Sequence, residues 1–295
     1  MKLNIKILVY IISITFFWSC KNDTKADAYG NFEATEITVS AQANGQLISF
    51  KVDEGNTLKK DAIVGIVDTI PLYLSKQQLL ANKQIIFAKS KGVLSQIAVL
   101  KAQLKTANNN LNRIQNLFKT KSATQKQLDD ATGKASVLNQ QIKSIETQNI
   151  AVVNEAKSVN AQLNQVADKI EKSYIKNPVN GTVLVKYAEP SEITSFGKPL
   201  YKIADLNTMQ LRVYVSETQL TSLKIGQQVS VKVDTNKTMK SYKGVITWIA
   251  SEAEFTPKII QTKEERVNLV YAVKIDVKND GSLKIGMPAE MWVSQ

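Results

Sequence analysis

Apolar residues recur at alternating spacings of three and four over the central hundred residues of the chain. One series runs from Val93 to Phe118, and a second runs from Leu128 to Ile170 with an interruption only at the polar Asn149. This spacing is the heptad repeat of a coiled coil. Because a short polar segment around Lys121 separates two series of matched length, the pattern predicts an antiparallel helical hairpin over residues 71–173. At 1.5 Å per residue each arm would be about 70 Å long.

Short runs of alternating apolar and polar residues flank the predicted hairpin, over residues 37–70 and 174–205. The two flanks repeat each other, since Asn44-Gly45 is matched by Asn180-Gly181 and Ile66-Val67 is matched by Ile203-Ala204. Neither flank has enough apolar surface for a core of its own. We therefore expect the two halves to close on each other into one small β-sandwich, with the hairpin inserted between them.

The last segment, residues 206–295, changes to longer alternating strands that suit a closed antiparallel β-barrel. The expected strands are Met209–Val215, Gln228–Val233, Gly244–Ile249, Val270–Ile275 and Ala289–Val293. A capped helical turn is expected at Ser216–Leu220, with Leu223 and Ile225 packed beneath it. Gly226 and Gly286 each precede a strand, and we expect them to serve backbone geometry.

The N-terminal segment has a positive start and an apolar run from Ile7 to Trp18, close to Cys20, the single cysteine of the chain. The run is shorter than the about 20 residues of a spanning helix. It resembles a bacterial lipoprotein signal peptide over residues 1–19, with lipid attached at Cys20. The alternative is an uncleaved anchor helix with an incidental cysteine. Either one predicts an exported, membrane-tethered protein, and residues 20–36 are expected to form a tether and a first strand.

The net charge of +12 raises the question of nucleic-acid binding. Much of the excess falls on the hairpin, but long coiled coils carry charge on their solvated faces. No aromatic side chains alternate with the basic ones, and an exported chain would not meet the genome. We expect no nucleic-acid partner.

The chain has no histidine, and it has only the one cysteine. It therefore lacks the commonest general base and metal ligand, and it has no thiolate cluster for zinc. There is also no glycine-rich phosphate loop with lysine and serine or threonine. We expect neither catalytic residues nor a metal site, and hence no enzyme.

Short motifs on both sides of the hairpin resemble the two half-motifs of a biotinyl/lipoyl-like domain. They are Val39-Ser40-Ala41, Gly45-Gln46-Leu47, Val52-Asp53-Glu54-Gly55 and Asn177-Pro178-Val179-Asn180-Gly181. In lipoyl carriers a tight turn with a modified lysine joins the halves. Here the hairpin occupies that turn, so the resemblance implies no cofactor and no lipoylated or biotinylated lysine.

A split lipoyl-like domain with a helical hairpin at its tip resembles the periplasmic adaptor subunits, also called membrane fusion proteins, of the haemolysin-secretion (HlyD) type. The resemblance covers nearly all of residues 30–293. It implies a mainly β fold with a long coiled-coil hairpin, a split lipoyl-like β-sandwich and a C-terminal antiparallel β-barrel.

The expected hairpin turn resembles the tip motif by which such adaptors engage a TolC-like outer-membrane channel. Arg113, Leu117 and Thr124 match that motif, with Thr124 at the position of a family serine. Arg113 could make charge-assisted hydrogen bonds, Leu117 could fill a groove between partner helices, and Thr124 could cap the second arm. The alternative is that Arg113 is only solvated, Leu117 only seals the seam, and Thr124 is only an N-cap.

The resemblance further implies a periplasmic protein that is anchored by lipid at Cys20, in the inner membrane, and that links an inner-membrane transporter to the channel. Copies would associate into a ring such as a hexamer. Residues 251–268 resemble adaptors of ATP-binding-cassette (ABC) exporters in particular, and they either contact the transporter or form a solvated loop. Alternatives are an adaptor of a proton-driven (RND-type) pump, a biotin or lipoyl carrier protein, and a coiled-coil protein that grips clients between its helices.

Overall fold

The computed structural model describes residues 26–235, 238–255 and 269–293, which form two compact units. Thr38–Lys202 form the unit that contains the hairpin and the sandwich, and the described residues up to Ile37 and from Ile203 onward form the barrel unit. The predicted fold class is confirmed, since a long helical hairpin accompanies an otherwise β structure. The expected signal peptide, Cys20 and most of the 251–268 segment lie outside the described residues.

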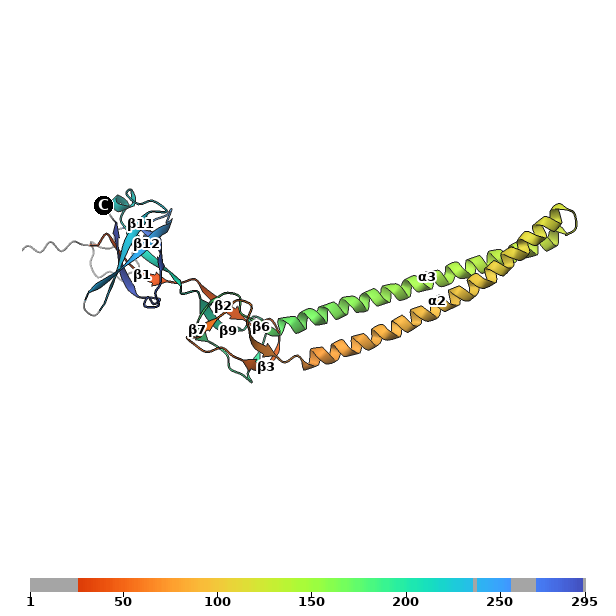
Figure 1. Cartoon of the computed structure of the whole chain (residues 1–295), viewed down its shortest axis with the longest axis horizontal. Helices are drawn as coiled ribbons and strands as arrows, with labels where there is room; N and C mark the ends of the chain where they lie inside the picture. The colour runs from red at the N-terminus through yellow and green to blue at the C-terminus, as the bar shows by residue number, and fades with distance from the viewer. Residues whose placement is uncertain (1–25, 236–237, 256–268, 294–295) are drawn as a thin grey trace, which may run out of the picture. The chain divides into compact units, whose positions relative to one another are not determined.

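Two long helices, α2 (Ile70–Lys119) and α3 (Gln125–Lys172), run antiparallel as a coiled coil (Figure 1). The seam of the predicted heptads is where the helices pack. Its buried residues are Ile86, Ile97, Ala107, Ala131, Ala135, Ile142, Val152 and Val159. Asn149, the predicted interruption, has a partner in the opposite helix, because the Ser90 hydroxyl donates to its Oδ1 at 3.3 Å. A polar pair inside an apolar seam favours one register of the two helices over shifted ones.

The turn between the helices is held by hydrogen bonds at both of its ends. Ser122 N donates to Leu117 O at 2.8 Å and Lys121 N donates to Phe118 O at 2.9 Å, which is the Schellman arrangement that ends a helix. This arrangement places Lys121 in the left-handed region, with φ of 57°. Thr124 then starts α3 through a capping box with Gln127.

The sandwich consists of two four-stranded sheets, and each sheet takes strands from both halves of the repeat. The first half supplies β2 (Glu36–Ser40), β3 (Gly45–Phe50), β4 (Thr57–Leu58) and β5 (Ile63–Val67). The second half supplies β6 (Tyr174–Lys176), β7 (Gly181–Lys186), β8 (Ile193–Thr194) and β9 (Pro199–Ala204). The strand orders are β2-β9-β7-β4 and β6-β5-β3-β8. The halves thus complete each other's sheets, as the shortage of apolar surface in each half predicted.

The internal repeat also appears in two side-chain hydrogen bonds that cross between the halves. Asn44 Oδ1 accepts from Phe196 N at 2.7 Å, and Asn180 Oδ1 accepts from Lys60 N at 2.8 Å. The two matched Asn-Gly pairs therefore have the same role, since the side chain of each asparagine accepts a hydrogen bond from a loop of the opposite half.

The buried Asn177 joins the halves from inside the sandwich. Its Nδ2 donates to Lys59 O and Val179 O, and its Oδ1 accepts from the hydroxyl of the fully buried Tyr201 at 2.9 Å. Burial raises the pKa of the Tyr201 phenol, so it remains a proton donor. The hairpin begins and ends beside this region, because Val67 N donates to Ser173 O at 2.9 Å.

The barrel closes through antiparallel pairs around a continuous apolar core that includes Leu211, Val231 and Ile275. Its described strands are β1 (Ala28–Glu33), β10 (Thr208–Val215), β11 (Gln228–Asp234), β12 (Met239–Ile249), β13 (Glu254–Phe255), β14 (Leu269–Lys278) and β15 (Pro288–Val293). β1 lies between β10 and β15, and β10 also pairs with β14, which completes the closure. The range 206–295 that the sequence indicated therefore leaves out one strand of the barrel.

The segments that connect the barrel strands agree with the expectations from the sequence, with one exception. The short helix α4 (Glu217–Leu220) has the expected capping box, and Gly226 and Gly286 both have positive φ. Leu223 is buried as expected, but Ile225 is 68% exposed. The expectation that Ile225 packs beneath the helical turn was wrong, because the chain turns at Gly226 and leaves the Ile225 side chain in solvent.

Candidate partner-docking site

The three predicted tip residues lie at the distal end of the hairpin and are exposed. Arg113 and Leu117 are one turn apart on α2, and Leu117 is 41% exposed although it is apolar. Thr124 is the N-cap of α3, where its Oγ1 accepts from Gln127 N at 3.3 Å. The structure thus places all three at one end of the rod, on both sides of the turn.

The heptad repeat assigns Arg113 and Leu117 to one flank of the hairpin. With Ile97 and Leu104 at position a, Arg113 is a c position and Leu117 is a g position. Neighbouring c and g positions face the same side of an antiparallel pair. Thr106 is the c position before Arg113, and Gln103 and Asn110 are the g positions before Leu117, so the flank that leads to the tip is polar and rich in amides.

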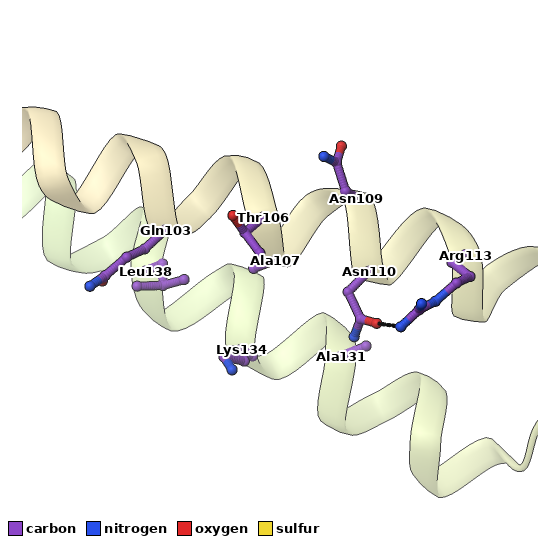
Figure 2. A pocket seen from close by; sticks show the side chains of 9 residues that line it. All are labelled: Gln103, Thr106, Ala107, Asn109, Asn110, Arg113, Ala131, Lys134 and Leu138. Carbon is purple, nitrogen blue, oxygen red and sulfur yellow. Dashed lines mark hydrogen bonds between the residues drawn. The ribbon is translucent and has the colours of Figure 1, made fainter.

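A groove of about 810 Å³ follows this flank (Figure 2). Its lining residues are Gln103, Thr106, Ala107, Asn109, Asn110 and Arg113 of α2 with Ala131, Lys134 and Leu138 of α3. The floor is low because Ala107 and Ala131 contribute only methyl groups to the seam. Sequence reasoning missed this groove, although the alanines at consecutive seam positions were a signal that could have indicated it.

Within the groove, Arg113 is held by its own helix. One Nη donates to Asn110 Oδ1 at 2.7 Å, an i, i−3 contact that orients the guanidinium along the flank (Figure 2). Its other N–H groups remain for a partner, and a guanidinium offers donors in a planar fork that suits carboxylate or carbonyl oxygens.

The distal part of the hairpin carries a net positive charge, because six cations there outnumber the carboxylates of Asp129 and Asp130. Towards the base, Lys89 pairs with Glu155 and Lys101 pairs with Glu146, each at 3.2 Å. Nearer the tip stand Lys105, Arg113, Lys119, Lys121, Lys126 and Lys134. In the part of the chain that the structure describes, none of these cations is within ion-pair distance of a carboxylate. The tip therefore presents a net positive surface to any partner.

The Thr124 hydroxyl is largely occupied by the capping box. It accepts from Gln127 N and also lies 3.3 Å from Gln127 Oε1, while Thr124 N donates to that same oxygen at 2.8 Å. Thr124 thus fixes the direction in which α3 leaves the turn. Contact with a partner would fall mainly to Arg113 and Leu117.

The described residues offer neither a metal site nor a membrane-spanning helix. No cluster of three or more carboxylate, histidine or cysteine side chains there could hold a metal ion. Among the described helices, none combines the length and the apolar character that crossing a bilayer requires.

No protein-family profile matches the chain. The membrane protein YbhG of Salmonella gallinarum is 27% identical over an alignment of 311 residues, which covers 96% of this chain and 92% of YbhG. The crystal structure of MacA from Actinobacillus actinomycetemcomitans superposes with a TM-score of 0.56 at 21% identity, covering 90% of this chain and 76% of MacA. The membrane fusion protein Spr0693 from Streptococcus pneumoniae gives a TM-score of 0.54 at 17% identity, covering 90% of this chain and 97% of Spr0693. The chain thus has the fold of the membrane fusion proteins.

Proposed function

We propose that this protein is a periplasmic adaptor that links an inner-membrane exporter to a TolC-like outer-membrane channel, for efflux or secretion. The observation that carries the proposal is the hairpin, which replaces the turn between the two sandwich halves and extends Arg113 and Leu117 to the end of a long rod. At 1.5 Å per residue, the 50 residues of α2 span about 75 Å, a length suited to crossing a gap between two partners.

At the tip, partner contact combines charge with an apolar anchor. The unpaired cations attract an acidic rim, Arg113 makes directional hydrogen bonds, and Leu117 enters a groove between partner helices. Thr124 holds the turn in the conformation that presents them. Because Leu117 is only 41% exposed in the hairpin, burying that remainder in such a groove would contribute about 1 kcal/mol.

At the other end, lipid at Cys20 anchors the protein to the inner membrane, beside the exporter. Replacement of Cys20 by alanine is expected to release the protein from the membrane fraction. Retention in that fraction would instead favour an uncleaved anchor helix.

The exporter is proposed to be of the ABC type, and the copies of the adaptor form a ring around it. The energy for transport comes from this partner, since the adaptor itself is proposed to be neither an enzyme nor a cofactor carrier. Purification of the native complex and identification of its ATPase or proton-driven partner would test the exporter class. An intact mass that includes lipoyl or biotinyl would contradict the absence of a cofactor.

The test of docking is the double variant Arg113→Asp/Leu117→Ser in a strain that lacks the chromosomal gene. Both side chains are exposed, so the helices should form normally, but the charge is reversed and the anchor is lost. We expect loss of export of the cargo, with unchanged circular dichroism and unchanged protein level.

The matched control is Val137→Ser/Lys143→Asp, which makes the same charge change and removes an exposed apolar side chain on α3, away from the turn. It should keep most of the export activity. Full activity of the tip variant, or equal loss in the control, would contradict the assignment of Arg113 and Leu117.

A further inference from the structure

The basal half of α2 carries apolar residues beyond those that the seam needs. Four of them lie one position after the seam residues, at heptad position e, and we call them the Phe87 stripe. The Phe87 stripe consists of Tyr73, Leu80, Phe87 and Leu94. Phe87 is 61% exposed, although Lys91 Nζ lies 4.7 Å from its ring centroid. Tyr73 and Leu94 are also exposed, whereas Leu80 is half-buried, and large apolar side chains repeated at this spacing mark a surface that packs against another molecule.

The Phe87 stripe borders an apolar groove on the same flank. The groove has a volume of about 540 Å³, and its apolar lining includes Leu80 and Phe87 of α2 with Val152, Val153 and Ala156 of α3. The stripe therefore offers both projecting side chains and a depression into which side chains of a neighbour can fit.

A second apolar stripe lies on the opposite flank of α2, at the same height along the rod. It occupies heptad position c, about 160° around the helix from position e, and we call it the Ile85 stripe. The Ile85 stripe consists of Ile85, Gly92 and Val99. Ile85 is 66% exposed and Val99 is 55% exposed. A Cβ added to Gly92 would have no atom within 4 Å, so its centre is open.

The Phe87 stripe and the Ile85 stripe end at about the same height along the rod, which is expected if both belong to one contact between copies. After Leu94, the next e positions are Lys101 and Asn108, and after Val99 the next c positions are Thr106 and Arg113. In a ring of parallel copies, equal heights face each other, and opposite flanks of one copy meet its two neighbours. Each e residue lies about 3 Å along the axis from a c residue, which is within side-chain reach.

We propose that the hairpins of adjacent copies pack side by side through the Phe87 stripe of one copy and the Ile85 stripe of the next, and that this contact ends before Lys101. The proposal rests on the ring proposed above and names its contact surface. The partner is a second copy of this chain, because the chain itself supplies both complementary stripes at one height. The distal third of each hairpin stays separate from its neighbours and carries the docking residues individually.

Disulfide trapping in cells tests the contact. In the variant Ile85→Cys/Phe87→Cys, the two thiols of one helix lie about 160° apart around that helix and cannot join each other, whereas position 87 of one copy and position 85 of the next differ in height by only about 3 Å. After mild oxidation we expect a ladder of dimers, trimers and larger species on non-reducing gels. Each single variant should show no more than the background of Cys20 in the wild type, because the contact joins different stripes.

The matched control is Thr106→Cys/Asn108→Cys, which has the same spacing and the same two heptad positions beyond the proposed boundary. It should give no ladder. Absence of the ladder from the Ile85/Phe87 pair would overturn the contact, and an equal ladder from the control would overturn its boundary. Strong dimers from Phe87→Cys alone would overturn it in favour of a symmetric pair.

The same experiment separates this proposal from the docking of the tip. Adding Arg113→Asp/Leu117→Ser to the trapping variant should leave the ladder intact. A ladder without export would mean that docking fails while the contact stands, and export by wild type without any ladder would mean that the contact alone fails.

Discussion

The buried Asn177 gives a sharp prediction about what holds the sandwich closed. Replacing Asn177 with alanine removes three side-chain hydrogen bonds, to Lys59 O, Val179 O and the Tyr201 hydroxyl. A typical hydrogen bond contributes about 1 kcal/mol net, and a buried group left without a partner costs about 1–3 kcal/mol. Because the Tyr201 hydroxyl is fully buried, we expect a loss of about 2–4 kcal/mol in the free energy of unfolding of the sandwich.

A double-mutant cycle separates the hydrogen bond from the loss of packing. Tyr201→Phe removes only the hydroxyl, so combining it with Asn177→Ala also removes the orphaned donor. The double variant should therefore be more stable than the sum of the single effects predicts, by about 1 kcal/mol or more.

Hydrogen exchange measured by mass spectrometry on peptides from β5 and β6 gives the local free energy of opening. The barrel is the internal control, because the tryptophans within the described residues are Trp248 and Trp292, both on its strands. Their fluorescence transition in urea should not move. A loss below about 1 kcal/mol for Asn177→Ala, or no coupling in the cycle, would refute the reasoning about buried polar groups.

Three further predictions concern other elements. Lys121→Gly should raise the midpoint of helix melting at 222 nm, with a gain of about 0.5–1 kcal/mol, because a positive φ is strained for lysine; a lower midpoint would contradict this. Gly30→Ala should lower the urea midpoint of the barrel fluorescence, because the new Cβ would lie 1.8 Å from Arg212 O; an unchanged midpoint would mean that β1 shifts freely. The Lys240 ammonium lowers the pKa of Asp280, so its contribution to barrel stability is present above the unfolded pKa near 4 and is lost as pH falls through the lower folded pKa; Lys240→Met should flatten that acid dependence in fluorescence titrations.

The hairpin and the sandwich could be predicted because their patterns are local and repeated. The heptad spacing indicated which faces of α2 and α3 meet, and the Asn-Gly repeat indicated two halves of one sandwich. The partner of Asn149 was not predicted, because Ser90 lies before the first apolar residue of the series and a hydroxyl carries no hydrophobic signal.

Other features depend on contacts between segments far apart in sequence. β1 was expected to be a strand, but its place between β10 and β15 follows from barrel closure and not from its own alternation. Asn177 belongs to one of the motifs that resemble a lipoyl-like domain. Its role as a buried hydrogen-bonding residue, however, depends on Tyr201, which is 24 residues away. The groove beside Arg113 required knowing that Ala107 of α2 and Ala131 of α3 both line it.

The pairing of β5 with β6 has a mechanical consequence. β5 leads into α2 and β6 follows α3, and their register pairs Ile66 with Tyr174, next to the start and the end of the hairpin. A pull on the tip would therefore load both strands at the same end and in the same direction, so the two would not slide past each other. The tension would pass instead to the bond between β5 and β3, whose register joins Leu47 to Val67 and Phe50 to Gly65. Under force, the hydrogen bonds between β3 and β5 would therefore bear the load from both helices, and the β3–β5 pair would be the first part of the sandwich to separate.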